Sequence, residues 1–553
     1  MKKIISVILC AAMVFGCVLT CSYAEEGKTY YIDGISGNDE NDGLSENSAF
    51  ASVEPVRELT LEAGDKILFR RDGIYNCTCL VLSCSGNENA QIEISAYGEG
   101  TKPILTTNER ADVLQLIDCS YITVSDLEIT AANGGGIWID TRTAQSNDIT
   151  LTGLTMHDIQ NTKAHSRDSL ISPTEARACV MVKSLPAKSR YAVNDLTISD
   201  CEMYDCGNGI SIWGSWNDSQ NPWCNTAEEV DPVFNKGLLV KNCYFHDMDA
   251  EAAVIGICDG AIITDCRCIN CCQNSGINDD GSSFCNAAMW FWGSVNSTFR
   301  CCEVAGQKTV TDGMTCDFDS FTHRCTYEYI YSHDNVRFVN NCPILTGQHD
   351  NCIRYCLSVN DNIGRNSLGQ AGKINREYGL KFYNNTIINP SEYAIEGVVD
   401  GLIANNIFVG NMTSSFRWSR KYVDNDTGEK YYNDFSGKMT NNCFWGTCIP
   451  SCSENSIVTN PGFAGRDITN PDSFRLADSS KLLGKGIKIG GFSGKDIFGN
   501  EITDTVNIGC YAGTGEADAE KPDVLDSIFR IVNTVLAKIY QFIVDCNNRY
   551  WLF

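Results

Sequence analysis

The segments Leu196-Thr-Ile-Ser-Asp-Cys201, Leu238-Leu-Val-Lys-Asn-Cys243 and Ala261-Ile-Ile-Thr-Asp-Cys266 repeat one pattern. In each, apolar and polar residues alternate over a β-rich stretch, which is followed by Asp or Asn and then a small residue. Further copies bring the spacing to between 21 and 47 residues and end at Leu127, Leu154, Cys302, Ile330, Cys356, Asn385 and Asn406. Such spacing, without helix-period runs between the copies, is typical of a solenoid whose coils carry inserted loops. We therefore predict an all-β parallel β-helix.

Motifs at both ends of this region carry a family resemblance. The N-terminal ones are Tyr30-Tyr-Ile-Asp33, Ser36-Gly-Asn-Asp-Glu-Asn-Asp-Gly43, Ala63-Gly-Asp-Lys-Ile-Leu-Phe69 and Ile92-Glu-Ile-Ser-Ala-Tyr-Gly98, and the C-terminal ones are Asn460-Pro-Gly-Phe463, Asp496-Ile-Phe-Gly-Asn500 and Ile508-Gly-Cys-Tyr511. In these segments the chain resembles the pectate-lyase-like superfamily of secreted bacterial right-handed parallel β-helix proteins. The resemblance covers about residues 28–513 and implies the right-handed fold. It does not choose a reaction, because the superfamily includes lyases, hydrolases, epimerases and non-catalytic binding proteins.

The chain divides into four predicted parts. Residues 1–24 read as a secretory signal peptide, with Lys2 and Lys3, an apolar stretch and Ser22-Tyr-Ala24 before the cleavage point, so we expect a secreted protein. Lipid attachment at Cys17 is the less favoured alternative. The β-helix domain then spans 25–513 and a polar linker 514–522. Residues 523–553 carry an apolar stripe at helical spacing and predict an amphipathic helix, through which any membrane contact would come.

The charge of the mature chain excludes some partners. Residues 25–553 hold 41 basic and 69 acidic side chains, a formal charge of −28. A negative field of this size repels nucleic acid and anionic membranes, so we expect neither as a partner. It also repels polyanionic sugars unless a bound cation inverts the local sign.

The mature chain carries 27 of the 30 cysteines, which in a secreted protein would suggest disulfides. However, Cys201, Cys243, Cys266, Cys302 and Cys356 occupy one repeat position, where Asn385 and Asn406 stand in later coils. We therefore interpret them as a ladder of packed, unbridged thiols. Zinc binding by Cys266-x-Cys268-x-x-Cys271-Cys272 is the weaker alternative, because a second well-spaced pair is missing.

Outward-facing columns on the strands provide candidate binding residues. We align the segments Ile137–Asp140, Ile210–Trp213, Met289–Trp292 and Met314–Asp317, whose first and third residues are mostly apolar and are expected to face the core. Trp213, Trp290 and Trp292 would then face outward, with Thr315 next to Trp290 and Asp317 next to Trp292. Exposed tryptophans suit sugar recognition, because an aromatic plane matches the apolar face of a pyranose ring. In the alternative, inserted loops cover these tryptophans as a second core.

Three carboxylates within eight residues, Asp312, Asp317 and Asp319, form the densest acidic cluster on a strand-like segment. Glycoside hydrolysis uses one carboxyl group as proton donor and another as nucleophile or base, about 5 to 9.5 Å apart. Residues two apart on a strand share a face about 6.6 Å apart, so Asp317 and Asp319 fit this requirement. We rank Asp317 first, Asp312 second and Asp319 third as catalytic candidates.

One coil further on, His333-Asp334-Asn335 suggests a His-Asp pair. His157-Asp158, Tyr204-Asp205 and His246-Asp247 occupy the same repeat position, which favours a stacked turn over a catalyst. Asp334 is kept as a fourth catalytic candidate because it follows the acidic cluster closely. Where the resemblance implies a Glu and a glycine run after this motif, the chain has Val336-Arg337-Phe338 instead. Arg337 could bind an acidic sugar.

We therefore expect a protein that binds a polysaccharide and hydrolyses it with paired aspartates and without a cofactor. The second hypothesis is a calcium-dependent polysaccharide lyase, in which Ca²⁺ acidifies the proton beside a uronate carboxylate and Arg337 or Lys373 removes it. The third is a glycan-binding surface protein without catalysis. The sequence identifies neither the sugar and its linkage nor the oligomeric state.

Overall fold

The computed structural model describes residues 27–159, 178–182, 190–216, 231–273, 286–309, 312–342, 348–361, 366–369, 376–410, 414–423, 428–490 and 494–517, and four positions beyond them, 532, 535, 536 and 539. The predicted signal peptide and Lys373 lie outside this set. So does the predicted C-terminal helix, except for the four positions, whose apolar side chains are exposed. These four positions are helical, and the helix as a whole lies outside the described residues. No helix in the described ranges is both long and apolar enough to span a bilayer.

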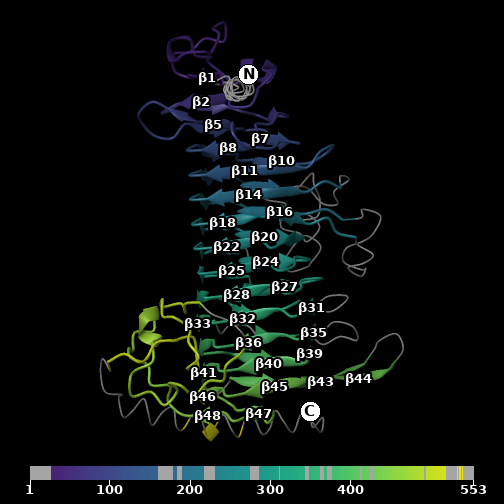
Figure 1. The fold of residues 1–553 in the computed structure, drawn as a ribbon, viewed down its shortest axis with the longest axis vertical. Coiled ribbons are helices and arrows are strands. Elements are labelled where there is room, and N and C mark those ends of the chain that lie inside the picture. The colour runs from purple at the N-terminus through teal and green to yellow at the C-terminus, as the bar shows by residue number, and fades with distance from the viewer. Residues whose placement is uncertain are drawn as a thin grey trace, which may run out of the picture.

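Three long parallel sheets form the walls of a solenoid whose strands stack along the long axis in Figure 1. Sheet A contains, in spatial order, β1 (Thr29–Ile32), β2 (Lys66–Arg70), β5 (Ile92–Tyr97), β8 (Ile122–Ser125), β11 (Ser146–Thr152), β14 (Val193–Ser199), β18 (Leu239–Lys241), β22 (Ile262–Thr264), β25 (Thr298–Arg300), β28 (Thr326–Glu328), β32 (Cys352–Arg354), β36 (Lys381–Tyr383), β40 (Gly401–Ala404), β45 (Gly437–Thr440) and β47 (Ser453–Glu454).

Sheet B contains β3 (Ile74–Asn76), β6 (Ile104–Thr106), β9 (Glu128–Thr130), β12 (Thr155–His157), β15 (Glu202–Tyr204), β19 (Tyr244–His246), β23 (Arg267–Ile269), β26 (Glu303–Ala305), β29 (Tyr331–His333), β33 (Leu357–Val359), β37 (Thr386–Ile388), β41 (Ile407–Val409), β46 (Cys443–Trp445) and β48 (Ile457–Val458). Sheet C contains β4 (Leu80–Leu82), β7 (Asp112–Ile117), β10 (Gly135–Asp140), β13 (Val180–Val182), β16 (Ile210–Trp213), β20 (Ala253–Gly256), β24 (Met289–Trp292), β27 (Met314–Asp319) and β30 (Arg337–Val339).

Short elements complete the coils. The small parallel sheets are β17 (Asn235–Lys236) with β21 (Cys258–Asp259), β31 (Gln348–His349) with β35 (Glu377–Tyr378) and β39 (Val398–Val399), and β34 (Asn366–Ser367) with β38 (Glu392–Ala394) and β42 (Ser415–Arg417). β43 (Ser419–Val423) and β44 (Lys430–Asp434) form an antiparallel hairpin. Single 3₁₀ turns lie at Glu46–Ser48, Pro55–Glu58 and Pro471–Phe474.

The repeat pattern of the sequence is the corner between sheets A and B. The Asp or Asn of each copy has left-handed backbone, with φ near +55° at Asp200, Asn242, Asp265 and Asn405. Asp and Asn adopt this conformation more readily than other non-glycine residues, which explains why they recur there. The next residue enters the core, as Cys201, Cys243 and Cys266 do.

Buried asparagines fill the last coils of the solenoid, and a C-terminal segment covers part of its outer face. In the last coils buried asparagines replace the cysteines, and Asn406 Oδ1 accepts a hydrogen bond from the Asn385 backbone N–H at 2.9 Å. The described residues of 459–490 and 494–517 contain no assigned strand and pack on the outer face of sheet B, where Leu476, Ile508 and Tyr511 contact β33, β37 and β41. Figure 1 shows this yellow-green segment beside those strands.

Candidate active site

The acidic segment of the sequence forms β27, in sheet C. In the strand register, Trp290 lies opposite Asp317, and Trp292 opposite Asp319. The predicted alignment was wrong here by two residues, since it placed Asp317 beside Trp292 and Thr315 beside Trp290. A register shift of two residues leaves every side chain of the strand on its original face, so the apolar pattern alone does not reveal the shift.

Thr315 does not face outward as predicted. Thr315 and Cys316 both face the core, and alternation resumes with Asp317 facing out. We call this pair of inward residues the inward step. It recurs in other coils of sheet C, for example at Ala252 and Ala253 and at Ala288 and Met289. Glu251, Ala287 and Met314, which precede the step in successive coils, therefore face outward, as does Arg337 opposite Met314.

We call Asp312, Asp317 and Asp319 the carboxylate cluster. Asp317 is 5% exposed and Asp319 9%, whereas Asp312, in the turn before β27, is half-buried. Asp319 Oδ1 accepts the backbone N–H of Ser320 at 2.7 Å, and Asp312 Oδ1 accepts from the Asn340 amide at 3.3 Å. Oδ1 of Asp317 is buried and has no hydrogen-bond partner in the described part of the chain.

Burial raises the pKa of Asp317 well above its usual value, and the charges of Asp319 and Asp312 raise it further. The guanidinium of Arg337 acts in the opposite direction and lowers it. The cluster can thus hold a neutral carboxylic acid next to a carboxylate, which is the pairing that acid–base chemistry on a glycosidic bond uses.

Glu251 is an acid at this face that the sequence alone did not single out. It is 1% exposed, and burial together with the charge of Asp312 raises its pKa to about 8. The predicted alignment omitted β20, which follows Glu251, because Ala253–Gly256 is apolar throughout and shows no alternation. Only the register of neighbouring coils places Glu251 on the outer face near Asp312.

The tryptophans do not form the exposed groove that was expected. Trp213, Trp290 and Trp292 are 2%, 7% and 1% exposed and pack with Trp216 and Phe321 in a second apolar cluster outside sheet C. Trp213 and Trp292 lie in contact, with ring centroids 5.7 Å apart. The covered-core alternative is therefore correct for these rings, because alternation predicts that a side chain leaves the main core but not whether other residues cover it.

Asp334 is not part of the cluster. It follows β29 of sheet B, is exposed, and has left-handed backbone with φ of 56°. Its Oδ2 lies 2.9 Å from Nδ1 of His333, and the pairs His157–Asp158 and His246–Asp247 repeat this contact. Recurrence in three coils identifies a stacked turn, and Asp334 is withdrawn as a catalytic candidate.

The cysteines of the possible zinc motif are packing residues. Cys266, Cys268, Cys271 and Cys272 are buried in the main core. Among the described residues, no group of three or more His, Cys, Asp or Glu side chains is arranged to hold a metal ion.

Comparison with known proteins agrees with this architecture. No protein-family model matches the chain. A lacto-N-biosidase of Bifidobacterium longum subsp. longum is 23% identical over 496 residues; the match covers 72% of this chain but 30% of that protein. Two crystal structures of GH136 lacto-N-biosidase from Eubacterium ramulus, both 16% identical, match with TM-scores of 0.53 and 0.51, covering 83% and 78% of this chain and 72% and 68% of those chains. The three parallel sheets and the likeness to these structures show that the chain has a parallel β-helix fold.

Proposed function

We propose that this protein is a secreted glycoside hydrolase that cleaves a glycan at the carboxylate cluster of β27. One observation carries the proposal: Asp317 is a buried carboxyl group with a raised pKa and an unpartnered oxygen, next to a second carboxylate on the same strand face. The lacto-N-biosidases that the chain resembles are glycoside hydrolases by name and support hydrolysis over elimination.

In the proposed mechanism Asp317, kept neutral, donates a proton to the leaving oxygen. Asp319 stays ionised and acts as nucleophile or as base toward water. Asp312, the most accessible of the three, holds a charge that keeps the pKa of Asp317 high. Activity should therefore fall as pH rises through the raised pKa of Asp317, because the proton donor is then lost.

The glycan is expected to approach from the side where Asp312, Arg337 and Asn340 are half-buried and still reach solvent. All three can hydrogen-bond sugar hydroxyl groups. The proposal does not assign sugar stacking to Trp213, Trp290 or Trp292, because these rings are covered. It needs no cofactor.

Residues 25–553 should be screened on a glycan panel that includes oligosaccharides ending in lacto-N-biose. The proposal expects new reducing ends, no ultraviolet-absorbing unsaturated product, and a rate that a calcium chelator leaves unchanged. Unsaturated products that require calcium would establish the lyase hypothesis instead. Binding of a glycan without any product would establish the binding-protein hypothesis.

A further inference from the structure

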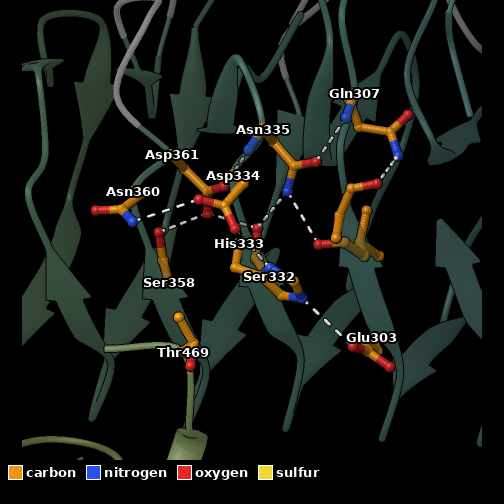
Figure 2. A network of polar contacts seen from close by, with 12 residues as sticks. Glu303, Gln307, Ser332, His333, Asp334, Asn335, Ser358, Asn360, Asp361 and Thr469 are labelled. Carbon is orange, nitrogen blue, oxygen red and sulfur yellow. Dashed lines mark hydrogen bonds and ion pairs between the residues drawn. The ribbon is translucent and has the colours of Figure 1, made fainter. Parts of the chain in front are cut away.

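A network of buried hydrogen bonds joins Ser332, Asn335 and Asp361 (Figure 2) and reaches Thr315 of β27. The hydroxyl of Ser332 donates to Asp361 Oδ2 at 2.6 Å, and Thr315 Oγ1 lies 2.7 Å from Ser332 Oγ. A serine hydroxyl has one hydrogen, which Ser332 gives to the carboxylate, so Thr315 must donate to Ser332. The chain therefore runs from Thr315 through Ser332 to Asp361.

Asp361 is the acceptor on which this network converges. It is 2% exposed, and it also accepts from the Ser358 hydroxyl at 2.7 Å and from the Asn335 backbone N–H at 2.9 Å. Burial raises the pKa of Asp361 to about 6, and these hydrogen bonds hold it below the value that burial alone would give. A buried carboxylate is costly to desolvate, so an apolar residue would fill the site more cheaply.

The position of Thr315 in the solenoid shows what the network holds. Equivalent residues in the preceding coils are small and cannot donate from a hydroxyl: Cys179, Gly209, Ala252 and Ala288. Among these coils, the one that carries the carboxylate cluster is the only one whose inward step begins with a residue that has a hydroxyl group. The amide of Asn335 also donates to Thr315 Oγ1, at 3.2 Å, and to the Val304 carbonyl at 3.0 Å.

We propose that Asp361 is a positioning residue for the carboxylate cluster: through Ser332 it gives the Thr315 hydroxyl a partner in the core, and so keeps this polar side chain in the inward step that turns Asp317 outward two residues later. Asp361 lies in the core and touches no substrate. The expected effect on catalysis rests on the proposed function, because it can be measured only if the protein cleaves a glycan. The expected effect on the conformation of β27 does not depend on that function.

Four variants test the proposal. Thr315→Val removes the hydroxyl but keeps the shape, Thr315→Ser restores it, and Asp361→Asn removes the acceptor charge. Asp65→Asn is the matched control, since Asp65 is also 2% exposed and also accepts backbone N–H groups, at 2.7 and 2.9 Å, but lies near the N-terminal end of the solenoid. Each is assayed for kcat and KM and for hydrogen–deuterium exchange of the peptide spanning residues 312–319.

We expect Thr315→Val and Asp361→Asn each to lower kcat about 10-fold or more with little change in KM, because misplacement of a catalytic group by about 1 Å is costly. Both should speed exchange in 312–319, Thr315→Ser should return both readouts toward wild type, and Asp65→Asn should alter neither. If Thr315→Val has the kcat and the hydrogen–deuterium exchange of wild type, the proposal is overturned. This test holds even if Asp361→Asn does not fold. If wild type cleaves no glycan, the proposed function fails, and exchange alone decides whether Asp361 holds the inward step.

Discussion

At the scale of single residues, Asp317 combines three features that seldom occur together by chance: burial, two neighbouring carboxylates and an unsatisfied oxygen. Burial of a carboxyl group in a dry environment favours its neutral form, and a nearby negative charge strengthens that preference. Perturbed carboxyl groups of this kind concentrate at catalytic sites. Asp334, with its exposed side chain in a repeated turn, has none of these features.

Trp292→Ala should lower the stability of the fold, and any effect on sugar binding should be secondary. The ring is 1% exposed and packs against Trp213, Trp216 and Phe321, so its removal leaves a cavity costing about 3 to 5 kcal/mol. Thermal denaturation should show a clearly lower Tm, whereas Tyr432→Ala, at a 54% exposed ring, should shift it little. A normal Tm combined with lost glycan binding would return Trp292 to the binding site.

His333 should make the fold more stable toward acid within a defined window. Burial lowers its pKa, but hydrogen bonds to Glu303 and Asp334 outweigh burial and raise the pKa above its usual value. A raised folded-state pKa means that the contribution is complete below about pH 6.5, the unfolded value, and is lost as pH rises through the folded one. The Tm of wild type should therefore exceed that of His333→Gln at pH 5 to 6 and converge with it at higher pH; a constant gap would contradict the assignment.

At the scale of elements, the sequence predicted the corners better than the faces. The Asp or Asn of each repeat was recognisable because left-handed backbone restricts residue choice at one position. Strands β13 and β20 were missed because three or four apolar residues carry no alternation that marks a strand. The inward step was also missed, because two consecutive core residues cannot be told in the sequence from a strand that is simply aligned in a different register.

Gly313 should matter more than its small size suggests. Its φ is +58°, and a Cβ there would lie 2.3 Å from the Thr309 carbonyl oxygen, two residues before the inward step. Gly313→Ala should lower the Tm and the activity, at a cost of about 1 to 3 kcal/mol from backbone strain plus the clash. Gly260→Ala is the control, since its φ is also positive, at +75°, but nothing lies within 4 Å of the added Cβ. Equal effects of both changes on turnover would show that the start of β27 does not set the site.

At the scale of the whole molecule, the stability of the solenoid comes from stacked identical positions rather than from cross-links. The 24 described cysteines are not joined by disulfides, and most of them are buried. Burial raises the pKa of Cys316 and Cys356, which keeps them protonated and unreactive. Most coils from Cys201 onward contribute one thiol or amide to the ladder, and Leu127, Leu154 and Ile330 fill the same position in others, so the core is continuous along the axis.

Reducing agents should therefore leave the Tm of residues 25–553 nearly unchanged. Disulfides typically contribute about 2 to 4 kcal/mol each, so several of them would give a plain shift. Thiol labelling in denaturant without reductant should count close to the 27 cysteines of that chain. Mass spectrometry that finds most of them paired would overturn the ladder interpretation.

The central claim is that the carboxylate cluster on the outer face of sheet C is the catalytic centre. The most direct test is the rate of glycan cleavage by Asp317→Asn beside Asp312→Asn, Asp319→Asn and Asp334→Asn. We predict a loss of about 100-fold or more for Asp317→Asn, strong losses for its two neighbours, and a wild-type rate for Asp334→Asn. Activity retained in Asp317→Asn but lost in Asp312→Asn would move the proton donor to Asp312; a wild-type rate in all three cluster variants, with Asp334→Asn inactive, would contradict the account.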